Sequence, residues 1–143
     1  MPRLKINLPD QLNYTSKLKV RISDLNYGGH VGNDRLLVYM QEARMEYIQS
    51  LGFEDEIRIK PPVGIIMTDC AIIYQSEILF GDSLSISIGC DHFTQYGFDM
   101  YYHITSIQDG RNIAKAKTGI LCFDYSKKML AEIPSELKEL TQS

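Results

Sequence analysis

Residues 33–51, NDRLLVYMQEARMEYIQSL, repeat apolar side chains at the three- and four-residue spacing of an α-helix. One wide apolar stripe is formed by Leu36, Leu37, Met40, Ala43, Tyr47, Ile48 and Leu51. Asn33 and Asp34 are residues typical of a helix start, and Gly52 is typical of a helix end. Arg44 is predicted to lie away from the stripe. The width of the stripe predicts a long helix that is mostly buried.

The segments around this helix alternate apolar and polar residues, as half-buried strands do. The predicted strands are 17–24 before the helix, and 63–74, 84–90, 98–107 and 113–124 after Pro61-Pro62. Asp109-Gly110 predicts a two-residue hairpin turn of type I′, and 135–140 predict a short terminal helix. This order predicts an α+β fold in which a curved antiparallel sheet wraps around one central helix. A sheet of few strands leaves free edges, so we expect a homodimer with a continuous sheet.

Composition narrows the class of protein. The chain has 143 residues, 44% of them hydrophobic, and a formal charge of −3, which predicts one domain over 1–143. The acidic excess argues against nucleic acid as a partner. No apolar run is long enough for a membrane span and no secretory signal is visible, so a cytoplasmic location is expected. Cys70, Cys90 and Cys122 are far apart and are predicted to be buried apolar residues, and no metal site is expected.

The connection between the first strand and the helix, residues 21–34, concentrates polar residues and glycines in one loop. Loops held between rigid elements often carry reactive groups. Glycine lets a substrate approach the backbone, and N–H groups at a helix start can hold a carbonyl oxygen as negative charge develops on it. An elaborate helix cap with a hydrogen-bonded His30 is the alternative interpretation.

Residues 24–33, DLNYGGHVGN, followed by 39–44, YMQEAR, resemble the hotdog-fold acyl-CoA thioesterases of the 4-hydroxybenzoyl-CoA thioesterase branch. Tyr74 and the Phe80-Gly81-Asp82 turn also match that pattern, and the similarity covers about residues 15–125. The resemblance implies a hotdog fold, homodimers and often homotetramers, and active sites at the dimer interface. It further implies hydrolysis of a CoA or acyl-carrier thioester without a metal or a separate cofactor.

The sequence departs from that branch at one position. Where the branch has its catalytic Asp, this chain has Asn26, and an amide cannot act as a general base at neutral pH. We favour Asp34, in the first helical turn, for the carboxylate role, and Asp24 is the alternative. Asn26 and His30 would then position water or the carbonyl, with backbone N–H groups near Gly32 and Asn33 forming the oxyanion site. Glu42, two helical turns beyond Asp34, is a further candidate.

Two other functions are compatible with the same fold. The MaoC-like enoyl-CoA hydratases carry D-x-N-P-x-H, which Asp24-x-Asn26 matches in part, although the proline is absent and His30 comes one residue late. A non-catalytic acyl-CoA-binding protein is the third possibility, and Asn26 is its best support. In either enzyme the CoA phosphates need cations, for which Arg111, Lys115 and Lys117 are candidates; plain solvent-facing charges are the alternative.

Overall fold

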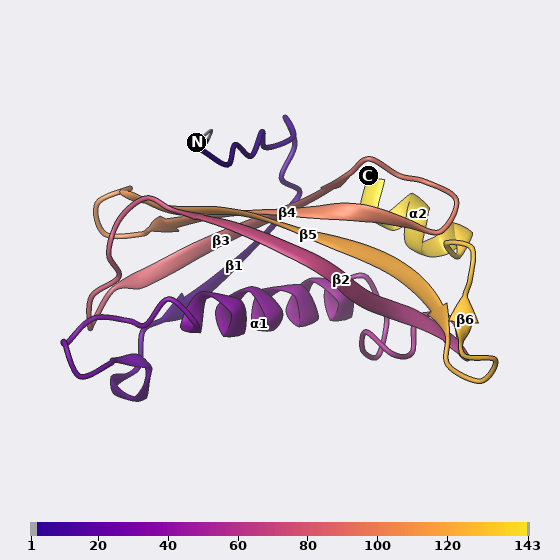
Figure 1. Ribbon diagram of the computed structural model, residues 1–143, viewed down its shortest axis with the longest axis horizontal. Coiled ribbons are helices and arrows are strands. Elements are labelled where there is room, and N and C mark those ends of the chain that lie inside the picture. The colour runs from indigo at the N-terminus through magenta and orange to yellow at the C-terminus, as the bar shows by residue number, and fades with distance from the viewer. Residues whose placement is uncertain (1–2, 143) are drawn as a thin grey trace.

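The computed structural model describes residues 3–142 as a strongly curved sheet with one long helix on its concave side (Figure 1). The elements follow the predicted order. They are β1 (Tyr14–Lys19), a 3₁₀ turn (Ile22–Asp24), α1 (Arg35–Ser50), β2 (Val63–Tyr74), β3 (Ser83–Asp91), β4 (Gly97–Ser106), β5 (Asn112–Asp124), β6 (Met129–Leu130) and α2 (Ser135–Gln142). The prediction of a curved antiparallel sheet around one long helix is therefore confirmed.

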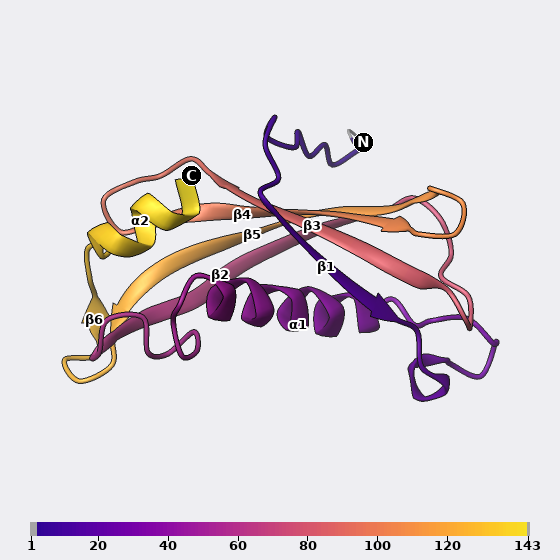
Figure 2. The same ribbon diagram turned by 180° about the vertical axis from the view of Figure 1, so that it is seen from behind.

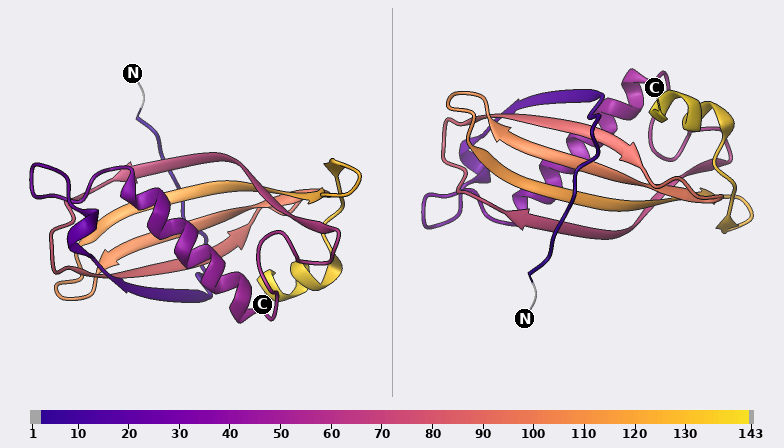
Figure 3. Two further views of the ribbon diagram at one scale, coloured as in Figure 1. Left: turned by 90° about the horizontal axis from the view of Figure 1, so that it is seen from below. Right: turned by 90° about the horizontal axis from the view of Figure 1, so that it is seen from above.

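The sheet has the strand order β1-β3-β4-β5-β2, and every neighbouring pair is antiparallel. The short β6, which the sequence patterns did not predict, adds to β5 at the far end. Because β1 and β2 are the outer strands of this path, the sheet has two long edges. In the view from behind, β1 is the edge nearer the viewer (Figure 2), and the view from below shows α1 running between the two edges (Figure 3, left).

The core lies between α1 and the concave face of the sheet. The helix contributes Leu36, Tyr39, Met40, Ala43, Tyr47 and Ile48, and the sheet contributes Leu84, Ile86, Ile88, Met100, Tyr102 and Ile104. The helix ends where the sequence predicted. Gly52 has a φ of 99°, its N–H bonds the Gln49 carbonyl at 3.0 Å, and the Phe53 N–H bonds the Ile48 carbonyl at 3.3 Å. This pair of bonds is the Schellman motif, which fixes where the chain leaves the helix.

The first strand begins and ends earlier than predicted. β1 covers 14–19 rather than 17–24, and Ile22, expected on its buried side, is 74% exposed. The cause is local, because the Asp24 carboxylate accepts the Arg21 N–H at 3.0 Å and folds the chain into a 3₁₀ turn. Asp side chains that bond nearby backbone groups compete in this way with a strand.

The buried face of α1 also differs from the predicted stripe. Leu37 is 45% exposed, whereas Arg44 is only 6% exposed. Arg44 is buried because it has partners there: its guanidinium donates to the Glu56 carboxylate at 3.1 Å and to the Tyr102 hydroxyl at 3.2 Å. The prediction that Arg44 points away from the core is therefore wrong.

Two smaller predictions need correction. The β4–β5 hairpin exists, but its loop spans 107–111 and has a positive φ only at Gly110, so it is not the two-residue type I′ turn. Cys122 is buried as predicted, Cys90 is partly buried, and Cys70 is exposed because it lies on the edge strand β2.

The N-terminal segment, residues 3–12, crosses the outer, convex face of the sheet (Figure 3). Ile6 is buried against that face. At Gly89 of β3, a Cβ atom would lie only 2.4 Å from the Gln11 carbonyl oxygen, so the segment runs in direct contact with the strand. Among residues 3–142, no helix combines the length and the apolar character that a bilayer span needs.

Candidate active site

A cavity of about 420 Å³ opens where the loop before α1 meets the connection between β2 and β3. Its lining residues are Asn26, His30, Val31, Gly32, Asn33, Leu36, Tyr74, Gln75, Ser76, Glu77 and Ile78. Its volume falls in the range of small-molecule sites, and apolar and polar side chains share the wall. This cavity is the candidate active site.

Asn26 holds the loop in shape. Its side-chain oxygen accepts the backbone N–H groups of Gly28 at 2.9 Å and His30 at 3.3 Å. The backbone N–H of Asn26 donates to the His30 carbonyl at 2.7 Å. Gly29, with a φ of 79°, makes the tight turn inside these bonds. The amide at position 26 therefore fixes the backbone of His30, and a carboxylate would serve as acceptor in the same way.

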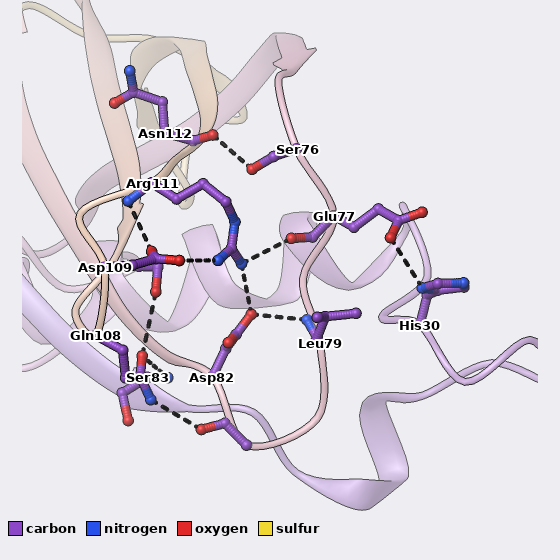
Figure 4. Close-up of polar contacts among 12 residues, drawn as sticks. His30, Ser76, Glu77, Leu79, Asp82, Ser83, Gln108, Asp109, Arg111 and Asn112 are labelled. Atoms are coloured by element: carbon purple, nitrogen blue, oxygen red, sulfur yellow. Dashed lines mark hydrogen bonds and ion pairs between the residues drawn. The ribbon is translucent and has the colours of Figure 1, made fainter.

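The other wall is the β2–β3 connection, which Arg111 holds in place (Figure 4). The Arg111 guanidinium donates to the Glu77 carbonyl at 3.1 Å, to the Asp82 carboxylate at 2.9 Å and to the Asp109 carboxylate at 2.7 Å. The Ser76 hydroxyl adds a bond to the Asn112 carbonyl at 2.7 Å. The β4–β5 hairpin thus anchors the segment that carries Glu77.

His30 and Glu77 meet across the cavity. The Val31 N–H bonds the Ile78 carbonyl at 3.1 Å, which joins the two walls. This contact brings His30 Nδ1 to 3.5 Å from a Glu77 carboxylate oxygen, and the two side chains point toward each other in Figure 4. The Nδ1 atom is shielded from solvent and has no other polar partner among the described residues, whereas the Glu77 side chain is 70% exposed. Glu77 can therefore face both His30 and a ligand.

Tyr74 and the start of α1 complete the cavity. The Tyr74 hydroxyl donates to the Asn33 carbonyl at 3.1 Å, and burial raises the pKa of Tyr74, with a further contribution from the nearby charge of Asp34. Within residues 3–142, the backbone N–H group of Asn33 has no acceptor, whereas the Gly32 N–H faces the Asp24 carbonyl in a short antiparallel bridge. Asn33 lines the cavity, so its N–H is the candidate donor for an oxygen atom of a bound ligand.

The structure separates the residues that the sequence singled out for catalysis. Asn26, His30 and Asn33 line the cavity. Asp24 and Glu42 instead line a second cavity on the other side of the start of α1. Asp34 is exposed at the N-terminus of α1 and lies outside the cavity lining.

None of the three cations proposed for CoA phosphates is among the residues that line the cavity. Arg111 is engaged by Asp82 and Asp109, as described above. Lys117 pairs with Asp69 at 2.9 Å and with Asp99 at 3.5 Å, and the hydrogen bond to Asp69 raises the lysine pKa. Lys115 lies on β5 beside His103 of β4 and has no ion-pair partner in the described chain.

Glu77 is the residue that the sequence reasoning missed. It is the only carboxylate of the described chain that lines the cavity. One signal pointed to it: between Asp69 and Asp82 it is the single acidic residue, three positions after Tyr74 and just before the Phe80-Gly81-Asp82 turn. Within residues 3–142, no three His, Cys, Asp or Glu side chains are grouped closely enough to hold a metal ion.

Solved structures with this architecture are numerous. The chain resembles Slr0204, a 1,4-dihydroxy-2-naphthoyl-CoA thioesterase from Synechocystis, with a TM-score of 0.81 and 18% identity over 90% of this chain and 94% of that one. It resembles BH1999, a gentisyl-coenzyme A thioesterase, with a TM-score of 0.79 and 20% identity over 90% of this chain and 99% of that one. A Synechocystis protein, sll0410, whose name proposes an esterase, is 20% identical over 123 residues, covering 85% of this chain and 74% of that protein.

A long helix wrapped by a curved antiparallel sheet is the hotdog fold, which the two solved thioesterase structures share with this chain. The chain belongs to the thioesterase-like superfamily, whose family model matches residues 20–140. Thioester hydrolysis is the activity of this class.

Proposed function

We propose that the protein hydrolyses an acyl-CoA or acyl-carrier thioester in the cavity at the start of α1, with Glu77 as the carboxylate that activates water. The observation that carries the proposal is the pairing described above: the one carboxylate in the cavity lining lies 3.5 Å from a shielded nitrogen of His30. A carboxylate next to a histidine and facing a cavity is an arrangement suited to general acid–base chemistry.

The reaction can be written with groups of this chain alone. Glu77 accepts a proton from water while the oxygen attacks the thioester carbonyl carbon. The negative charge that develops on the carbonyl oxygen is held by the N–H group of Asn33 at the start of α1. The carbon–sulfur bond then breaks, the thiolate leaves, and the proton held on Glu77 passes to it, so that free acid and thiol are released. His30 holds Glu77 in position, and no step calls for a metal or a separate cofactor.

Asp34 remains the competing carboxylate. It stands at the start of α1, close enough to influence Tyr74, but it faces solvent and lies outside the cavity lining. Glu77 is favoured because it is in the lining and has a partner that fixes its position. The two assignments are separated by substitution of each residue, as argued in the Discussion.

We also propose that two copies pair along β2, so that the site lies at a dimer interface. β2 is an outer strand, and its middle is exposed at Met67, Thr68, Asp69 and Cys70. Free strand edges with apolar side chains favour pairing with another strand. The same strand ends at Tyr74 in the cavity wall, so a partner strand along β2 would lie next to the site.

Met67→Lys is expected to weaken this dimer at least tenfold, because an antiparallel pairing of two β2 edges brings like charges together at a desolvated contact. Light scattering coupled to size exclusion over a dilution series gives the dissociation constant. Met129→Lys, at an exposed methionine of β6, is the matched control and should leave the mass unchanged. A wild-type protein that is monomeric at all concentrations would overturn the dimer proposal.

The activity itself is tested by thiol release. A thiol-reactive dye reports hydrolysis of short-chain, long-chain and aromatic acyl-CoA thioesters. Aromatic thioesters come first, since the names of both thioesterase structures described above refer to aromatic acyl groups. Turnover of at least one thioester is expected. Binding without thiol release would indicate a non-catalytic acyl-CoA-binding protein. Loss of absorbance from a conjugated enoyl thioester with no release of thiol would indicate a hydratase, and either result would overturn the proposal.

A further inference from the structure

A second cavity, of about 650 Å³, lies between the free edge of β1 and the first half of α1. The start of α1 separates it from the candidate active site: Leu36 lines the first cavity, whereas Arg35, Val38 and Tyr39 line the second. We call this second cavity the basic groove, after the four cations in its wall, Lys17, Lys19, Arg21 and Arg35.

The four cations of the basic groove are unpaired. None of them takes part in an ion pair within residues 3–142, whereas Arg44, Arg58, Arg111 and Lys117 all do. The groove also contains two carboxylates, Asp24 and Glu42. Asp24 already accepts the backbone N–H of Arg21. Four cations against two carboxylates give this wall an excess of positive charge, although the whole chain has a formal charge of −3.

A buried hydroxyl also lines the basic groove without a hydrogen bond. Tyr39 is only 3% exposed, and its hydroxyl oxygen has no hydrogen-bond partner among the described residues. Burial raises the pKa of Tyr39, and the nearby Asp24 carboxylate raises it further although the two do not meet in hydrogen-bond geometry. A buried donor without an acceptor costs free energy, which an oxygen atom of a ligand would recover.

We propose that the basic groove binds a phosphorylated nucleotide. Phosphate groups carry several negative charges and are held best by clustered lysine and arginine side chains. Leu18, Val20 and Val38 supply an apolar part of the same wall, against which a base can pack. The nucleotide has two possible sources: the 3′-phospho-ADP end of a CoA substrate, or a separate nucleotide that acts as an effector. Assignment to the CoA substrate rests on the proposed hydrolytic function, whereas nucleotide binding itself does not.

The direct test measures binding of 3′,5′-ADP to the full chain by calorimetry, with no turnover involved. The Lys17→Gln/Lys19→Gln variant changes two exposed side chains and is expected to weaken binding about tenfold. Arg21→Gln/Arg35→Gln is the second variant and should weaken binding similarly. Lys60→Gln/Lys127→Gln removes the same charge from exposed lysines elsewhere and should bind like the wild type. Thermal melts verify that each variant is folded.

Kinetics then separates the two sources of the nucleotide. The readout is the ratio of KM for an acyl-CoA to KM for the same acyl group on N-acetylcysteamine, which lacks a nucleotide. A rise of about tenfold in this ratio for Lys17→Gln/Lys19→Gln would assign the basic groove to the CoA arm of the substrate. An unchanged ratio together with weakened 3′,5′-ADP binding would assign it to a separate nucleotide. Wild-type 3′,5′-ADP affinity in both double variants, or no binding to the wild type, would overturn the proposal.

Discussion

Glu77→Gln is expected to lower kcat for thioester hydrolysis by about 10²–10⁴-fold, the usual contribution of a positioned general base. The amide keeps the size of the side chain and can still contact His30, so the cavity keeps its shape and KM should change little. What is lost is the ability to accept a proton from water.

The comparison with Asp34→Asn decides between the two carboxylates. If Asp34 supplies the base, its variant shows the large loss and Glu77→Gln keeps most of the wild-type rate, which would refute the assignment to Glu77. Glu139→Gln, on the terminal helix α2, makes the same chemical change far along the chain and controls for loss of charge. His30→Ala tests the positioning role and should lower the rate. If His30 acts through Glu77, adding Glu77→Gln to His30→Ala should lower the rate by less than Glu77→Gln lowers it in the wild type.

Arg44→Ala is expected to reduce the free energy of unfolding by about 3–5 kcal/mol. The guanidinium links α1 to the sheet through the Tyr102 hydroxyl, which in turn bonds the Thr118 hydroxyl at 2.8 Å, and it pairs with Glu56 from the connection after the helix. Burial alone would lower the pKa of Arg44, but Tyr102 and Glu56 outweigh it and keep the side chain charged. Removing this cation leaves buried partners without their hydrogen bonds.

Urea unfolding followed by circular dichroism gives the size of this effect. Arg58→Ala, which breaks ion pairs of an arginine that is 56% exposed, is the control and should cost about 0–1 kcal/mol. Arg44→Met/Glu56→Gln should recover part of the loss of Arg44→Ala, because it fills the space and removes the unpaired acid. A change below about 1 kcal/mol in Arg44→Ala would show that water replaces the lost bonds and that the network does not stabilise the fold.

Much of the fold could be predicted from periodicity. The stripe on residues 35–50 and the alternation after Pro61-Pro62 reflect burial on one face, and burial on one face is what the fold requires. The errors occur where a side chain bonds a partner that is far away in the sequence or only a few residues away. Arg44 is buried by Glu56 and Tyr102, and β1 ends early because Asp24 bonds Arg21. Hydropathy patterns contain neither kind of information.

The site was predictable only in part for a related reason. The loop that carries Asn26, His30 and Asn33 stands out because its polar residues and glycines are contiguous. Glu77 lies 47 residues after His30, and the two meet only because the Val31 N–H bonds the Ile78 carbonyl and Arg111 holds the connection in place. The role expected of Asp34 came from its nearness in sequence to that loop, and the structure adds Glu77 as a second carboxylate, which reaches the loop through His30.

Residues 3–12 also restrict how larger assemblies can be built. Two sheets that stack face to face stand about 10 Å apart and interdigitate their side chains. The N-terminal segment lies on the convex face of the sheet, with Ile6 buried against it, and occupies that space (Figure 3). Stacking of two dimers through their convex faces would therefore have to enclose both N-terminal segments between the sheets or displace them from the sheet.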